Sequence, residues 1–118
     1  METETFTAVF NRKAVLWSME GNLEDAKALL SSFLLEARKL ARQIEEDITT
    51  RNALALRIHS EELHESASEI YSLAIKYFAN RLGGAAESYD FATASRMLNG
   101  LNASLKILDK KLRAEGWL

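Results

Sequence analysis

Two histidines and several acids lie close together in the stretch IHSEELHESASEIY, residues 58–71. His59 and His64 bracket the adjacent acids Glu61 and Glu62. An imidazole beside a carboxylate can act as a general acid and base, bind a metal ion, or accept a phosphoryl group. Each of these chemistries needs its side chains in a particular orientation, so the elements that carry them decide which is possible.

Length and composition limit the class of protein. A chain of 118 residues is long enough for one core and too short for two, so we expect a single domain over residues 1–118. Apolar residues make up 47% of the chain, and no apolar run approaches the roughly 20 residues that a membrane span needs. The formal net charge is -2, without the basic excess typical of nucleic-acid binding. We therefore expect a protein that binds neither a membrane nor nucleic acid.

Cysteine content and the first residues bear on cofactors and location. The chain has no cysteine, which excludes disulfides, thiolate metal sites and thiol nucleophiles. The opening residues METETF lack the basic and then apolar layout of a secretory signal. We predict a cytoplasmic protein without a cofactor, and the sequence leaves its oligomeric state open.

The spacing of apolar residues and helix breakers predicts helix almost throughout. No proline interrupts the chain. Asn22 and Asp90 are the expected N-caps of two long helices, and Gly83-Gly84 is expected to end the helix between them. The predicted helices cover residues 7–19, 23–49, 52–82 and 91–112, each within about a turn.

Long amphipathic helices joined by short connections pack as antiparallel neighbours. The helix expected over residues 52–82 has a stripe of apolar residues at helical spacing. This stripe consists of Leu56, Leu63, Ala67, Ile70, Ala74 and Phe78. We predict an all-α fold, an up-and-down antiparallel four-helix bundle with an additional short N-terminal helix packed across one end.

The stripe orients the residues of the opening stretch. At about 100° per residue, Glu61 points away from the core, His64 lies on the flank next to it, and His59 lies on the opposite flank. Ile58 points outward among the acids. A convex helix face offers no cleft that would desolvate an acid and base pair. The spacing Glu61-x-x-His64 matches half of a di-iron motif, but no second copy follows. We therefore predict no metal site and no catalytic residue here.

Two segments resemble the histidine-containing phosphotransfer (HPt) domain of two-component phosphorelays. The segment FNRKAVLWSMEGNLEDAKALLSSFL resembles the opening part of that family, with Gly21-Asn22 in place of Gly-Asp and Phe33 at the usual distance beyond it. The segment ANRLGGAAESYDFATASRML resembles its later part, with Leu82 before a loop and Asp90 at the start of the last helix. The resemblance covers residues 9–114.

The resemblance implies where the reactive residue would lie. Leu63, Ala67 and Ile70 fall on buried positions of the family, which puts Glu61 at the position of the phospho-accepting histidine. A glutamate is a poor nucleophile at neutral pH, and nothing nearby would stabilise its acyl phosphate.

Three neighbouring positions also differ from the pattern of the family. His64 stands where the family has a lysine, Glu65 where it has a glycine, and Tyr71 where it has a second glycine. The lysine would have offset phosphate charge, and the first glycine would have left room for an incoming receiver. Glu65 instead adds negative charge, so the resemblance implies a domain without the usual relay reaction.

The implied function is an HPt-like signalling module that is not an enzyme. It would act by binding a response-regulator receiver, a histidine kinase component or a related partner. We expect this partner on a surface formed by the helices over residues 23–49 and 52–82. The predicted contact residues are Ile58, Glu61, Glu62, His64, Glu65 and Ser68.

Two alternatives remain open from the sequence. His64, one turn from Glu61, could itself accept a phosphoryl group, against the repulsion of three flanking acids. The apolar stripes would look the same in a helical chaperone or oligomerisation bundle unrelated to phosphorelays.

Overall fold

The computed structural model describes residues 9–118, which form five helices and contain no strand. The helices are α2 (Arg12–Ser18), α3 (Leu23–Thr49), α4 (Ala53–Glu69), α5 (Leu73–Glu87) and α6 (Phe91–Ala114). The prediction of an all-helical fold is confirmed. The prediction of one helix over residues 7–19 is wrong in its first half, because Phe10 and Asn11 are not helical and α2 begins at Arg12. The expected start near Thr7 lies outside the described residues. None of the described helices is long and apolar enough to cross a membrane.

Each helix begins after a polar side chain that accepts a hydrogen bond from the backbone N–H three residues further on. These N-caps are Asn11, Asn22, Asn52, Ser72 and Asp90. Such caps satisfy N–H groups that the first turn of a helix leaves unpaired. The predicted caps Asn22 and Asp90 are thereby confirmed.

Residues 52–82 form two helices, so the prediction of one continuous helix is wrong. α4 ends at Glu69, Tyr71 adopts a left-handed backbone with φ of 57°, and α5 begins at Leu73. The backbone N–H of Ser72 donates to the carbonyl of Ala67 at 3.0 Å, the pattern that commonly closes a helix. Neither glycine nor proline marks this turn in the sequence.

Gly83 and Gly84 lie inside α5, so the prediction that they end a helix is also wrong. Their neighbours Ala85 and Ala86 are buried in the core, and helix stability in proteins comes mostly from such packing. Burial of this face outweighs the low helix propensity of glycine, and the helix continues to Glu87.

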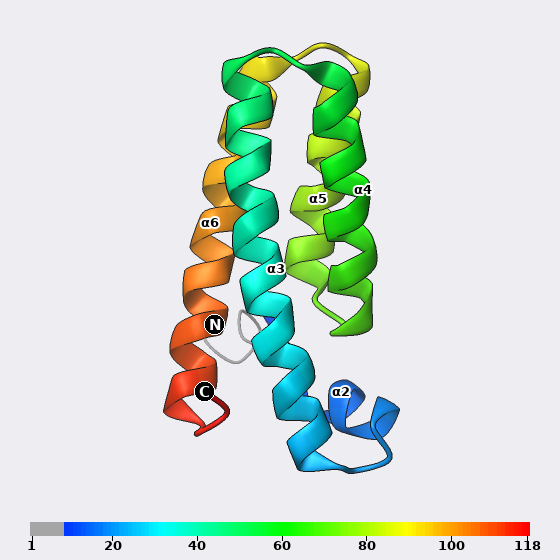
Figure 1. Cartoon of the computed structure of the whole chain (residues 1–118), viewed down its shortest axis with the longest axis vertical. Coiled ribbons are helices and arrows are strands. Elements are labelled where there is room, and N and C mark those ends of the chain that lie inside the picture. The colour runs from blue at the N-terminus through cyan, green and yellow to red at the C-terminus, as the bar shows by residue number, and fades with distance from the viewer. Residues whose placement is uncertain (1–8) are drawn as a thin grey trace.

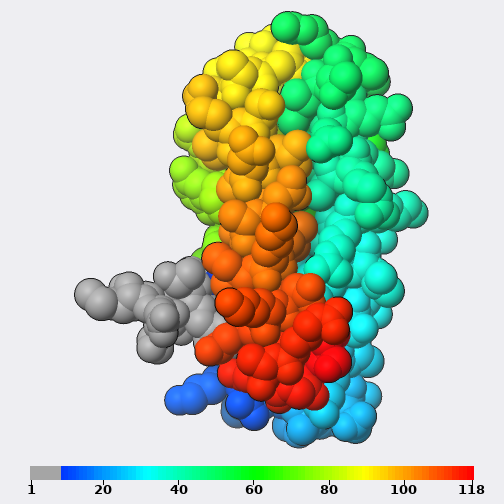
Figure 2. Space-filling view, turned by 90° about the vertical axis from the view of Figure 1, so that its left-hand side faces the viewer, coloured from blue at the N-terminus to red at the C-terminus, as the bar shows by residue number. Residues whose placement is uncertain are grey.

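The four longer helices lie side by side as a helical bundle (Figure 1). α3 and α5 each pack against both α4 and α6. α3 extends beyond the hairpin of α4 and α5, and α2 lies beside its first turns (Figure 1). From the side, α6 and α3 are in contact along a continuous seam (Figure 2).

Buried apolar side chains from all these helices form one core cluster. Four members of the predicted stripe are fully buried, namely Leu56, Leu63, Ala67 and Ile70. Ala74 and Phe78 are only half-buried, because the turn at Tyr71 gives α5 its own register. The register predicted for α4 is correct.

Candidate functional site

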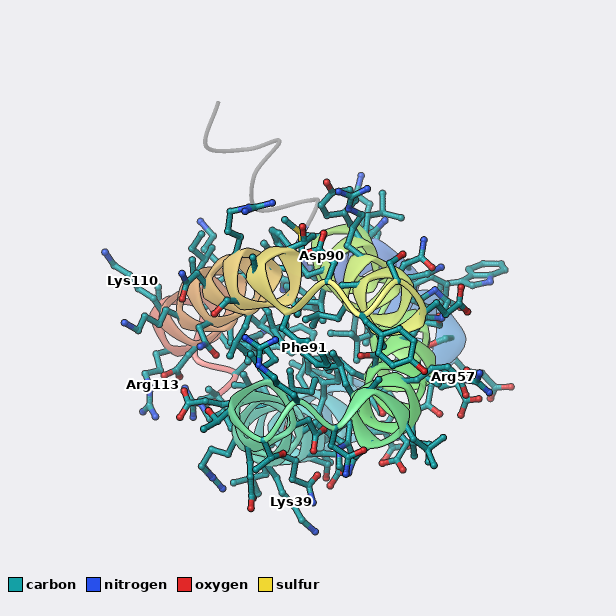
Figure 3. The ribbon with its side chains drawn as sticks, turned by 90° about the horizontal axis from the view of Figure 1, so that it is seen from above. Lys39, Arg57, Asp90, Phe91, Lys110 and Arg113 are labelled. Atoms are coloured by element: carbon teal, nitrogen blue, oxygen red, sulfur yellow. The ribbon has the colours of Figure 1, made fainter. Side chains whose placement is uncertain are left out.

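The outer face of α4 carries the residue that the resemblance places at the phospho-acceptor position. Glu61 is exposed, and its carboxylate lies 3.6 Å from the guanidinium of Arg57 one turn earlier. Ile58 is 45% exposed on the same face. Seen along the bundle, the labelled Arg57 lies on the outer side of the molecule, whereas Phe91 lies between the helices (Figure 3). This face of α4 is therefore exposed to solvent.

A groove of about 680 Å³ lies between α4, α5 and the start of α6. Among the predicted contact residues, Glu61, His64 and Glu65 line it, so the expectation that this helix face has no cleft is wrong. Across from them, α5 contributes Asn80, Arg81, Gly83, Gly84 and Glu87. These acids and His64 therefore face α5, although the predicted surface combined them with the helix that precedes α4.

The other predicted contact residues lie outside this groove. Ile58 and Glu62 are exposed farther round α4. The hydroxyl of Ser68 donates to the backbone carbonyl of His64 at 3.0 Å within the helix. The structure thus groups three of the six predicted residues with α5 and leaves the other three apart from them.

His59 lies on the opposite flank of α4, as its place in the helix predicts. Its Nδ1 atom is 2.6 Å from a carboxylate oxygen of Asp47 on α3. Asp47 is only 7% exposed, and a buried carboxylate needs such a partner. His59 therefore joins α4 to α3, which accounts for one of the two histidines structurally.

Gly83 and Gly84 hollow out the groove. A Cβ atom on Gly84 would meet no heavy atom within 4 Å, and one on Gly83 would only touch the Cβ of Ser60 at 3.9 Å. By contrast, a Cβ atom on Gly100 of α6 would overlap the ring of Phe78. A glycine inside a helix costs roughly 1 kcal/mol relative to alanine. Internal packing accounts for that cost at Gly100 but not at the two glycines of α5.

Negative charge is in excess along the groove. Its lining has four carboxylates and two guanidinium groups, from Glu61, Glu65, Glu87 and Asp90 and from Arg57 and Arg81. The hydroxyl and the backbone N–H of Thr93 donate to Asp90 at 2.6 and 3.0 Å. These hydrogen bonds, the hydroxyl first, lower the pKa of Asp90.

Exposed apolar side chains lie toward both ends of the groove. Leu54 and Tyr89, 65% and 74% exposed, line a smaller hollow that shares Arg57 with the groove. Leu73 and Tyr77 are exposed on the first turns of α5. Their helical spacing puts them on the same stripe of α5 as Gly84. The lining of the groove is thus mainly polar, with Leu54 and Tyr89 in the adjoining hollow and Leu73 and Tyr77 earlier on the same stripe of α5.

Sequence reasoning missed the groove residues on α5 and Arg57, which lies one turn before Glu61 on α4. The signal available for Gly83 and Gly84 was their position within a run of buried alanine and leucine residues, which is unusual for a helix end. No group of three or more metal-ligating side chains is close enough to bind a metal within residues 9–118.

Comparison with protein-family models, with curated proteins and with solved structures gives no match for this chain. Its function is therefore inferred from its own residues and geometry.

Proposed function

We propose that the chain is an HPt-like signalling module that binds a response-regulator receiver or a related partner without phosphotransfer. The observation that carries this proposal is Glu61, exposed in the middle of α4. The buried residues Leu63, Ala67 and Ile70 support the register in which Glu61 corresponds to the acceptor of the family. A fixed carboxylate then replaces the reactive imidazole.

The order of the helices supports the same proposal. In an HPt-like arrangement, α3 to α6 make up the up-and-down antiparallel four-helix bundle, and α2 is the additional short helix. The backbone of Tyr71, with φ of 57°, fits the second glycine of the family, because glycine adopts this conformation at the lowest cost.

The groove favours docking over chemistry. Glu65 and Glu61 lie beside the half-buried His64, and carboxylates repel an incoming phosphoryl group. Arg57 is already paired with Glu61. A receiver with an acidic pocket would meet the same repulsion, so we expect affinity to come from apolar contacts such as Ile58 and from a metal ion bound in that pocket.

The proposal is tested by mixing the chain with purified receivers that carry a radiolabelled phosphoryl group. We expect at least one receiver to bind, measured by calorimetry, with no label on the chain. Label that is stable on the chain and lost in a His64→Gln variant would replace this proposal by active phosphotransfer through His64. The proposal would be contradicted if no receiver encoded by the same organism as this chain binds it.

A second candidate function is a helical chaperone or oligomerisation bundle unrelated to phosphorelays. The exposed apolar residues Leu54, Leu73 and Tyr89 favour it, since exposed apolar surface often marks an interface. Light scattering would reveal self-association. A pull-down would show whether an unfolded substrate or a receiver binds.

A further inference from the structure

We propose that the groove between α4 and α5 binds an amphipathic helix of a partner protein, with basic side chains in its middle and apolar side chains at its ends. This inference concerns the segment that a partner inserts. It holds whether or not that partner is a receiver, so it goes beyond the proposed function.

The first support is space that the fold itself does not use. Gly84 has open space where its Cβ would lie, and Gly83 has only an ordinary contact with Ser60. Two adjacent glycines weaken a helix, yet no internal contact requires them here. Glycine allows another chain to approach the backbone closely. A partner helix lying over α5 would use this space.

The second support is the charge of the lining. Glu65 and Glu87 line the groove and form no ion pair within the described part of the chain. Glu61 has one partner, Arg57. The excess of carboxylates complements lysine and arginine side chains on an incoming segment. It also disfavours an anionic ligand.

The third support is the apolar surface toward both ends. From Leu54 to Ser68, α4 rises roughly 21 Å, about four helical turns. A helix of that length would reach Leu54 and Tyr89 with one end and Leu73 and Tyr77 with the other. Helices that bind in grooves use apolar anchors at helical spacing in this way.

A second copy of the chain fits the groove less well. In a two-fold dimer the same surface lies on both sides of the interface. The excess of carboxylates on one copy would then face the excess on the other, and like charges facing each other oppose association.

The probe is a synthetic helical peptide of about four turns, with leucines at both ends and lysines in the middle. A matched peptide carries glutamates in place of the lysines. We expect amide signals of Gly83, Gly84 and Glu65 to shift in NMR spectra of the labelled full chain when the basic peptide is added. The acidic peptide should leave them unchanged.

Two variants link binding to the groove. Gly84→Gln fills the hollow and should weaken binding of the basic peptide at least tenfold, whereas Ala103→Gln, on an exposed position of α6, should not. A paired Glu65→Gln and Glu87→Gln change should weaken it in the same direction. Circular dichroism of each variant would check that it is folded.

Several results would overturn this inference. They are the absence of groove shifts at millimolar basic peptide, equal binding by the acidic peptide, and unchanged binding by Gly84→Gln. Shifts of the same amides on concentrating the chain alone would assign the groove to a second copy. If receivers bind while the peptide does not, the inference fails and the proposed function stands.

Discussion

Charged side chains join α3 to both α4 and α6, whereas α4 and α5 meet without an ion pair between them in the described part of the chain. His59 of α4 bonds to the buried Asp47 of α3 at 2.6 Å. Arg38 of α3 donates to Asp109 of α6 at 2.8 Å. Arg38 and Asp47 of α3 thus pair with neighbouring helices, whereas Glu65 and Glu87 of the groove form no ion pair within residues 9–118.

The glycines divide in the same way. Gly100 gives the ring of Phe78 room where α5 meets α6. A Cβ atom on Gly84 would meet no atom of the chain, and one on Gly83 would make only an ordinary contact with Ser60 at 3.9 Å. The glycines of α5 weaken their helix and do not improve internal packing, so the stability of the fold does not explain them. The four predictions that follow test this contrast, from the largest expected effect to the smallest.

The His59→Ala substitution should cause the largest loss of stability. It leaves the buried carboxylate of Asp47 without its partner, and an unsatisfied buried polar group costs about 2 kcal/mol. Urea unfolding followed by circular dichroism would measure the loss. His59→Gln keeps a donor and should lose less. If the two variants unfold alike, the bond to Asp47 does not hold α4 to α3.

The Gly100→Ala substitution should destabilise the chain by about 1 kcal/mol or more. The added methyl group overlaps the ring of Phe78, and overpacking of this kind outweighs the better helix propensity of alanine. The same urea experiment applies. An increase in stability would show that the ring moves aside freely.

The Gly84→Ala substitution is the matched control for Gly100→Ala and should increase the stability of the chain. The new methyl group meets no atom of the chain, so only the gain in helix propensity remains, about 1 kcal/mol. A loss of stability here would reveal an internal role for the glycine, and the contrast with Gly100 would be lost.

The smallest expected effect is the loss of the ion pair between Arg38 and Asp109, whose contribution to stability depends on pH. The hydrogen bond from Arg38 lowers the pKa of Asp109 against an opposing effect of desolvation, and Arg113 lowers it further. The pKa of Asp109 is therefore lower in the folded chain than in the unfolded one. The stability that the ion pair contributes is present above about pH 4 and is lost as pH falls through the folded pKa.

Substitution of Arg38 by methionine should therefore cost about 0.5 kcal/mol at neutral pH, as for other exposed pairs. The difference from the unmodified chain should shrink toward pH 2, where Asp109 is protonated in both. Unfolding midpoints measured across this pH range would check it. A difference that stays constant with pH would exclude the ion pair as its cause.

The sequence predicts the elements that obey simple local rules. Asn22 and Asp90 are caps of the usual types, and the apolar spacing from Leu56 to Ile70 fixes the orientation of α4 correctly. The outward position of Glu61 and the flank positions of the two histidines follow from helix geometry alone. The α4 side of the groove could therefore be predicted from the sequence.

The α5 side of the groove could not be predicted, because α5 follows a turn that neither glycine nor proline marks in the sequence. Tyr71 adopts the left-handed conformation that usually selects glycine, and the turns at Arg51 and Tyr89 are alike in this respect. In each of these turns the polar cap follows directly, as Ser72 does here. Only the reversal of the chain at Tyr71 brings Gly84 opposite Glu61.

The most direct test of the proposed function is a gain of phosphotransfer. A variant with Glu61→His, His64→Lys and Glu65→Gly supplies the imidazole, the lysine and the glycine at the positions that the resemblance assigns to them. We predict that radiolabel from a phosphorylated receiver stays off a chain with His64→Lys and Glu65→Gly alone and appears on the triply changed one. If no receiver labels the triply changed chain while the receivers still bind it, Glu61 does not occupy an acceptor position, and the HPt-like assignment is contradicted.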